Sequence, residues 1–145
     1  MAACVFCRIV TGDEAAVLVY EDAQVLAFLD YRPLFPGHTL VIPRAHVPTL
    51  AELPDDLVVP LWDLVRRLVR AMPGALGAEG TFVGVNNRVS QSVPHLHVHV
   101  VPRRRGDGLR GFFWPRQRYP SPAAMEELAV RIRGALVEDA TTGED

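Results

Sequence analysis

The order of strand-like and helix-like segments limits the folds open to this chain more than any other feature. Five short runs are rich in valine, leucine and phenylalanine and are bounded by turn residues, which is typical of β-strands. These runs are 17–22, 25–30, 38–44, 81–87 and 95–103. Helical segments follow the third and the fifth run, without regular β–α–β alternation. This order predicts an α+β fold with a mainly antiparallel five-stranded sheet and two main helices.

The two predicted helices are 53–74 and 121–139. The first has apolar residues at helical spacing, with its arginines largely off the apolar side. Pro60 fits poorly inside it, so we expect the helix either to break in its first turn or to begin after Asp55. The second has Ser121 as its expected N-cap and Pro122 at its first position.

Length and composition indicate one globular domain. With 145 residues and 49% hydrophobic content, the chain can bury a single core, expected over 1–139, before a flexible tail at 140–145. The formal charge of −2 gives no reason to expect nucleic acid as a partner. No run of about 20 apolar residues predicts a membrane span, and the first residues lack the features of a secretory signal. We therefore expect a cytoplasmic protein.

The chain contains no lysine, and all 15 of its basic residues are arginine. This excludes phosphate binding by a P-loop lysine, Schiff-base and pyridoxal chemistry, and ligases that form a lysine adenylate. If the protein handles phosphate, then histidine, arginine and backbone amides must do so.

Three of the five histidines alternate with apolar residues at positions 95, 97 and 99. On a strand, residues two apart share a face, so these imidazoles would line one surface while Leu96 and Val98 point into the core. A solvated strand face that happens to contain histidine is one interpretation. The alternatives are a metal site and a site for anionic phosphate.

Each alternative has a chemical basis. Cys4 and Cys7 have the C-x2-C spacing of a zinc knuckle, and His46 is a candidate further ligand, although two unpaired thiols would have the same spacing. A redox motif of the thioredoxin type fits poorly, because no β–α–β unit follows the pair. For phosphate chemistry, a neutral imidazole can attack phosphorus, with its other ring nitrogen held as a donor and its neighbours stabilising the developing charge.

The sequence resembles the hydrolase branch of the histidine triad (HIT) superfamily. "HLHVHVV" fits the family motif of histidines alternating with apolar residues, and "FCRIVTGD", "VYEDAQVLAFLDYRPLFPGHTLVIPRAH" and "QSVPHLHVHVVPR" resemble the corresponding stretches of the family. The likeness covers most of 4–103 and is strongest to nucleoside phosphoramidases and to zinc-containing bacterial HIT proteins. It implies a HIT-like fold and a nucleotide hydrolase.

The resemblance also implies roles for individual residues. His97 matches the nucleophile, His99 the histidine that contacts the α-phosphate, and His38 an additional active-site histidine. Further matches are residues that bind phosphate and assist the leaving group (Asn86 and Ser92, with Gln91 in the same loop), a carboxylate for the ribose (Asp30), the lining of a purine slot (Phe6, Ile9, Phe28 and Leu29), and ligands of a structural zinc ion (Cys4, Cys7, His46 and His95). The apolar four could equally be plain core residues. Family members usually form homodimers, and the substrate would be a purine nucleotide, an AMP or GMP derivative.

Two features of the sequence depart from the family pattern or extend beyond it. Ser90 stands where relatives often have a glycine before the Gln-Ser pair, which puts backbone contacts to phosphate in doubt. The arginine-rich segment 103–118 is either a solvated loop or a recognition element for further phosphates, anchored by the aromatic residues 112–114.

The favoured function is a hydrolase acting at the α-phosphorus of purine nucleoside phosphoramidates or dinucleoside polyphosphates. A nucleotidyltransferase or phosphorylase, and a nucleotide-binding protein with negligible turnover, are the alternatives.

Overall fold

The computed structural model describes residues 4–110 and 116–142 of the chain. The chain divides into two compact units, Met1–Asp107 and Gly108–Asp145. The sheet and all predicted site residues belong to the first unit.

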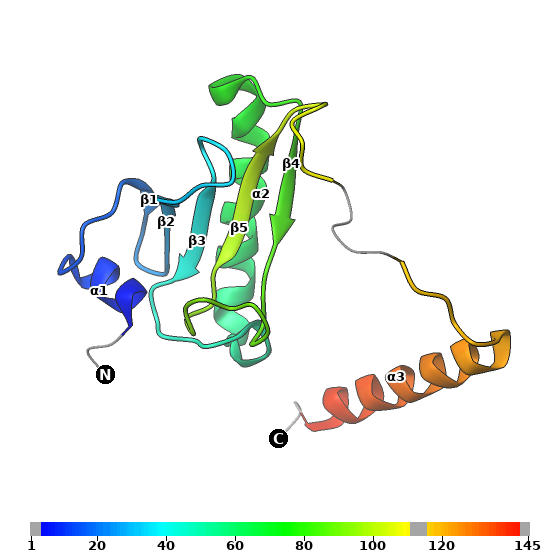
Figure 1. Cartoon of the computed structure of the whole chain (residues 1–145). Coiled ribbons are helices and arrows are strands. Elements are labelled where there is room, and N and C mark those ends of the chain that lie inside the picture. Colours follow the sequence, from blue (N-terminus) through cyan, green and yellow to red (C-terminus); the bar gives the residue numbers. More distant parts are fainter. Residues whose placement is uncertain (1–3, 111–115, 143–145) are drawn as a thin grey trace. The chain divides into compact units, whose positions relative to one another are not determined.

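A five-stranded sheet forms the centre of the first unit (Figure 1). Its strands are β1 (Leu18–Glu21), β2 (Val25–Leu29), β3 (Thr39–Pro43), β4 (Gly80–Gly84) and β5 (Val98–Arg103). The strand order is β1-β2-β3-β5-β4, and every neighbouring pair is antiparallel. The predicted α+β class and antiparallel sheet are confirmed.

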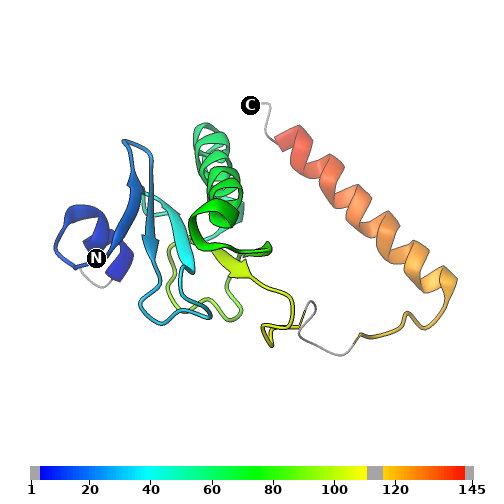
Figure 2. The same ribbon diagram turned by 90° about the horizontal axis from the view of Figure 1, so that it is seen from above.

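The central strands β2 and β3 are almost entirely buried on both faces because their residues alternate between two apolar sets. Val25 and Ala27 belong to a cluster that includes the buried side of helix α2 (Asp55–Leu76), which covers one face of the sheet (Figure 2). Leu26 and Phe28 point to the other face, where they pack with Leu40, Ile42 and Phe6 of helix α1 (Val5–Thr11). The period of two along a strand therefore separates the two cores.

Helix α2 is continuous across both of its prolines, Pro60 and Pro73. Neither expectation for Pro60 is correct, since the helix begins at Asp55 and does not break in its first turn. Pro60 removes one hydrogen bond, the one that its missing N–H would give to the carbonyl of Asp56. Asp56 is exposed, so water can solvate that carbonyl. The predicted apolar side is buried, with Leu61, Leu64 and Val65 at its centre.

All five strands are shorter than predicted, and the largest differences are at the start of β5 and the end of β4. Strand β5 begins at Val98 rather than at residue 95, because Pro94 has no N–H and the N–H of His95 donates to the carbonyl of Val93 (2.8 Å). Strand β4 ends at Gly84 rather than at residue 87, since Gly84 pairs with His99 and the partner strand extends only one residue further. The expected alternation of side chains also holds for the residues just before β5, since Leu96 lies in the same core cluster as the buried side of α2.

Two short helical elements were not predicted. Helix α1 begins after Cys4, whose Sγ accepts a hydrogen bond from the N–H of Cys7 (3.4 Å), and ends at Gly12, which has a φ of 86°. That glycine is the sequence signal that could have located the helix end. The other element is the 3-10 turn η1 (Leu50–Glu52).

The second unit contains helix α3 (Pro122–Thr142). Its predicted start is confirmed, because the Ser121 hydroxyl accepts a hydrogen bond from the N–H of Ala124 (3.1 Å). The helix ends three residues beyond the predicted 139, and positions 143–145 of the expected tail lie outside the described residues. Among the described helices, none is long and apolar enough to cross a membrane.

Candidate active site and metal centre

Three histidines and one carboxylate meet at one end of the central strands. Asp30 follows β2, His38 precedes β3, His97 directly precedes β5 and His99 lies within it. The pairing of Leu40 with His99 brings β3 and β5 side by side, and the backbone N–H of Asp30 donates to the carbonyl of His38 (2.9 Å). The four predicted residues are therefore brought together by strand pairing.

His97 is held in one orientation and is only 4% exposed. Its Nδ1 lies 2.8 Å from the carbonyl oxygen of His95, which only accepts, so Nδ1 carries the proton and Nε2 has the free lone pair. Burial lowers the pKa of His97, which keeps the ring neutral near pH 7. The edge of Phe6 packs on the ring at a centroid distance of 5.1 Å. His97 is thus a neutral imidazole with one available nitrogen, the form that a nucleophile requires.

His38 and His99 are hydrogen-bonded to each other beside Asp30. The distance from His38 Nε2 to His99 Nδ1 is 2.9 Å, and the nearer carboxylate oxygen of Asp30 is 3.7 Å from His38 Nε2. Burial lowers the pKa of His38, and burial together with the neighbouring His97 and His38 lowers the pKa of His99 to about 4. The rings of His97 and His99 have centroids 5.0 Å apart. Both neighbours of His97 are therefore neutral at pH 7.

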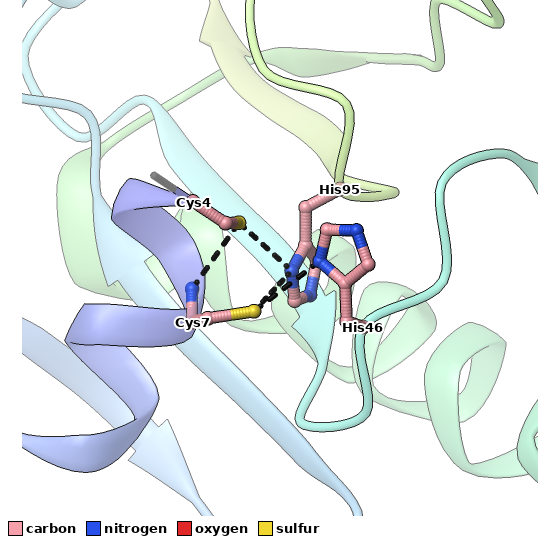
Figure 3. Close-up of side chains that lie close together, drawn as sticks. All are labelled: Cys4, Cys7, His46 and His95. Atoms are coloured by element: carbon pink, nitrogen blue, oxygen red, sulfur yellow. Dashed lines mark hydrogen bonds between the residues drawn. The ribbon is translucent and has the colours of Figure 1, made fainter. Parts of the chain in front are cut away.

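A second cluster combines two thiols and two imidazoles from distant parts of the chain (Figure 3). Cys4 and Cys7 come from the start of α1, His46 from the segment after β3, and His95 from the segment before β5. All four were predicted as zinc ligands, and one donor atom from each lies within 4.8 Å of the others. Cys4 Sγ is 3.5 Å from His95 Nδ1, and Cys7 Sγ is 3.2 Å from His46 Nδ1.

These distances fit a tetrahedral zinc ion. Zinc bound at about 2.3 Å to sulfur and about 2.1 Å to nitrogen holds the two donor atoms about 3.6 Å apart. The third sulfur–nitrogen distance, from Cys7 Sγ to His95 Nδ1, is also 3.6 Å. A set of two cysteines and two histidines is typical of closed structural zinc sites.

The surroundings of His95 also suit a ligand. Its Nε2 lies 2.8 Å from the carbonyl oxygen of Pro43, so this nitrogen carries the proton and Nδ1 presents its lone pair to the two thiols. Burial and the adjacent Cys4 thiol raise the pKa of Cys7, an effect that a bound cation would reverse. When bound, zinc would join α1 to the segment that carries His97.

The loop before the histidines bends through two left-handed residues, Arg88 (φ 68°) and Ser90 (φ 60°). Ser90 therefore adopts the conformation that a glycine would favour. The Gln91 amide braces the loop, accepting from the N–H of Arg88 (2.9 Å) and donating to the carbonyl of Pro48 (2.7 Å). Asn86 is exposed.

Ser92 is also exposed, and it lines a cavity of about 740 Å³. The lining of this cavity includes Cys4, Cys7 and His46, so the cavity lies beside the metal centre. The roles expected for Ser92, Asn86 and Gln91 in phosphate binding remain predictions.

The residues predicted for a purine slot differ in their surroundings. Phe6 and Phe28 are buried, with ring centroids 5.3 Å apart, and Ile9 packs against the same cluster. Leu29 is 37% exposed at the end of β2. Phe6 and Phe28 are core residues, and Phe6 packs against His97. The part of all four residues in binding a base remains a prediction.

The first arginines of the segment 103–118 have partners within the chain. Arg103 pairs with Asp107 (2.6 Å), Arg105 lies 3.9 Å from Glu79, and Arg104 donates to the backbone carbonyl of Leu76. The contacts of Arg103 and Arg104 favour a structural role for these two arginines, whereas the Arg105 side chain is 94% exposed. The aromatic residues 112–114, expected as anchors, lie outside the described residues.

Comparison with known proteins identifies the family. The model of the HIT domain matches residues 11–106. The chain belongs to this family. The HIT assignment made from the histidine motif is confirmed, and the HIT domain falls within the unit that contains the sheet.

Relatives of this HIT protein include a protein named as an enzyme and a zinc-bound solved structure. It is 38% identical over 136 residues to the adenosine 5'-monophosphoramidase of Schizosaccharomyces pombe, covering 92% of this chain and 98% of the relative. A solved structure from Streptococcus mutans has a TM-score of 0.84 at 38% identity, covering 94% of this chain and 87% of that one. A zinc-bound histidine triad protein from Mycobacterium smegmatis has a TM-score of 0.71 at 38% identity, covering 90% and 98% of the two chains.

Proposed function

We propose that this HIT protein hydrolyses purine nucleotides at the α-phosphorus through a nucleotidyl intermediate on His97. The observation that carries the proposal is the hydrogen bond from His97 Nδ1 to the carbonyl of His95, which leaves Nε2 unprotonated beside two neutral histidines. The phosphoramidase activity named for the fission yeast relative supports the same chemistry. The proposed substrates are purine nucleoside phosphoramidates or dinucleoside polyphosphates.

The reaction proceeds in two displacements. His97 Nε2 attacks the α-phosphorus, a P–N bond forms, and the bond to the amine, phosphate or nucleotide leaving group breaks with its electron pair on the leaving atom, an amine leaving group taking up a proton from solvent water. Water then attacks the same phosphorus and gives up one proton to the solvent, the P–N bond breaks with its electron pair returning to Nε2, and AMP or GMP leaves. His99 and the loop residues Asn86, Gln91 and Ser92 are proposed to hold the phosphate oxygens.

The nucleoside is proposed to bind between Asp30 and the apolar residues of α1 and β2. Asp30 is half-buried, and its Oδ1 accepts a hydrogen bond from the N–H of Arg32 (2.9 Å), which fixes the carboxylate for a ribose hydroxyl. Phe6, Ile9, Phe28 and Leu29 are the proposed contacts of the purine. We also propose that the protein is cytoplasmic, forms a homodimer and binds a structural zinc ion through Cys4, Cys7, His46 and His95. Light scattering tests the homodimer, and metal analysis tests the zinc ion.

The test of the function is chemical trapping of the intermediate. The protein is incubated with an adenosine phosphoramidate and, separately, with a diadenosine polyphosphate, quenched, and digested for mass spectrometry. We expect AMP on the peptide that contains His97, and we expect turnover to fall by about 10⁴-fold or more in His97→Gln. Calorimetric AMP binding by His97→Gln serves as the folding control. Unchanged turnover in that variant would overturn the proposal.

Each of the two alternative functions would give a different result in the same experiment. A nucleotide-binding protein with negligible turnover would bind AMP in both wild type and His97→Gln and would show no adenylylated peptide. A transferase or phosphorylase would form the adduct but release AMP only slowly until an acceptor such as inorganic phosphate is added.

A further inference from the structure

The ring orientation of His38 is fixed by a backbone group that the proposed reaction does not otherwise use. The N–H of Leu34, in the loop between β2 and β3, lies 3.1 Å from His38 Nδ1 and can only donate. His38 Nδ1 must therefore accept, so the proton of the neutral ring is on Nε2. The groups that face Nε2 are acceptors, namely His99 Nδ1 at 2.9 Å and the Asp30 carboxylate at 3.7 Å.

The same reasoning extends to His99. Because His38 Nε2 donates, His99 Nδ1 must accept, and the proton of neutral His99 must be on its Nε2. We propose that the backbone amide of Leu34 sets the tautomer of His99 through His38, so that His99 presents a neutral Nε2–H donor at the active site. His38 is then a positioning residue. The tautomers follow from the hydrogen bonds alone, whereas their catalytic consequence rests on the proposed hydrolysis.

This arrangement limits what His99 can do. To become an imidazolium it would need a proton on Nδ1, which faces the N–H of His38, so the hydrogen bond between the two rings would have to break. A neutral His99 that gave up its Nε2 proton would become an imidazolate. His99 therefore stabilises charge on a phosphate oxygen by donating a hydrogen bond, and it does not protonate the leaving group.

The hydrogen-bond relay from the Leu34 N–H through His38 to His99 also affects whether a metal ion can bind at this place. Donor atoms of Asp30, His38 and His99 lie within 4.8 Å of one another, a spacing that a metal ion could use. Binding through His38 Nε2 would require its proton to move to Nδ1, where it would meet the N–H of Leu34. The backbone amide thus favours a hydrogen-bonded pair of histidines over a metal site.

Prolines, a glycine and a backbone hydrogen bond restrict the conformation of the loop that carries the Leu34 amide. Pro33 and Pro36 flank Leu34 and Phe35, Gly37 adopts a φ of 100°, and the N–H of His38 donates to the carbonyl of Phe35 (3.0 Å). The Leu34 side chain is 55% exposed, so it can be replaced with little loss of packing. Replacing Leu34 with proline would remove the N–H and the exposed side chain, and because proline also restricts the backbone of residues 33 and 34, variants of His38 serve as a second test.

The test compares Leu34→Pro with Leu34→Ala by ¹⁵N NMR of the histidine rings in the free, zinc-loaded protein. In wild type and Leu34→Ala, we expect unprotonated Nδ1 and protonated Nε2 in both His38 and His99. In Leu34→Pro, we expect protonated Nδ1 to appear in both rings. The opposite tautomers in wild type, or unchanged tautomers in a folded Leu34→Pro, would overturn the proposal.

A second pair of variants keeps the test independent of the loop. His38→Gln retains a side-chain N–H that can donate to His99 Nδ1, whereas His38→Leu does not. We expect the Nε2–H form of His99 to persist in the glutamine variant and to be lost in the leucine variant. Equal spectra from the two would also overturn the proposal.

The kinetic readout separates this proposal from the proposed function. Losing one donor in the transition state lowers kcat by about 10²-fold or more, so we expect at least about a tenfold fall in kcat for Leu34→Pro, with KM little changed, and no such fall for Leu34→Ala. If the tautomers are as expected but no nucleotide is turned over, the tautomer assignment stands and the hydrolase proposal fails. If kcat is equal in the two variants while the tautomers differ, the catalytic role of the relay is refuted.

Discussion

The lowered pKa of the half-buried His99 predicts a specific loss of stability in acid. Its pKa is about 4 against an ordinary value of 6.5, so between these values the unfolded chain binds a proton that the folded chain does not. Stability must therefore fall as the pH decreases through this window. At about 1.4 kcal/mol per pKa unit, His99 alone accounts for a loss of about 2 kcal/mol by pH 5 and about 3 kcal/mol by pH 4.

The assay is urea unfolding at a series of pH values for wild type and His99→Gln. The buried histidines His38, His95 and His97 also have lowered pKa values and also destabilise the folded protein as the pH falls. The pH dependence of wild type alone therefore does not report on His99. The difference between the two proteins isolates position 99. Wild type should lose about 2 kcal/mol relative to His99→Gln between pH 7 and pH 5. Parallel curves would refute the reasoning that burial and the neighbouring histidines keep His99 neutral.

Three further predictions concern the metal centre and the backbone. Wild type should contain one zinc ion per chain and Cys4→Ala clearly less, measured by metal analysis; equal contents would contradict the site. Gly37→Ala should lose about 1–3 kcal/mol on chemical unfolding because of its φ of 100°, while Gly74→Ala, a helical position with open space, should gain up to about 1 kcal/mol. Ser90→Gly should relieve its left-handed φ of 60° and keep full activity, whereas a large loss of turnover would show that the serine side chain is needed.

Local patterns were sufficient to predict most of the fold. Short apolar runs bounded by turn residues identified the strands within a few residues, because a strand buried on both faces must be apolar at nearly every position, as β2 and β3 are. The errors are at the ends of strands and helices. Strand β4 ends close to the first residue of its partner β5, which the sequence of β4 does not show. Pro60 is tolerated because water can solvate the carbonyl that loses its hydrogen bond, and this depends on the exposure of that turn in the folded protein.

The sequence by itself identified the side chains that we propose to carry the chemistry. The alternation of His95, His97 and His99 with apolar residues, together with the Cys4–Cys7 spacing, supplied both the candidate active site and the candidate metal centre. Family likeness then assigned the first motif histidine to the metal and the second to the substrate.

Only the tertiary structure decided which nitrogen of each ring holds a proton. The groups that decide it are backbone atoms: the carbonyl of Pro43 for His95, the carbonyl of His95 for His97, and the N–H of Leu34 for His38. Every residue except proline has both a carbonyl and an N–H, so sequence identity cannot reveal which one will face an imidazole. That choice depends on the packing of loops and strands that lie far apart along the chain.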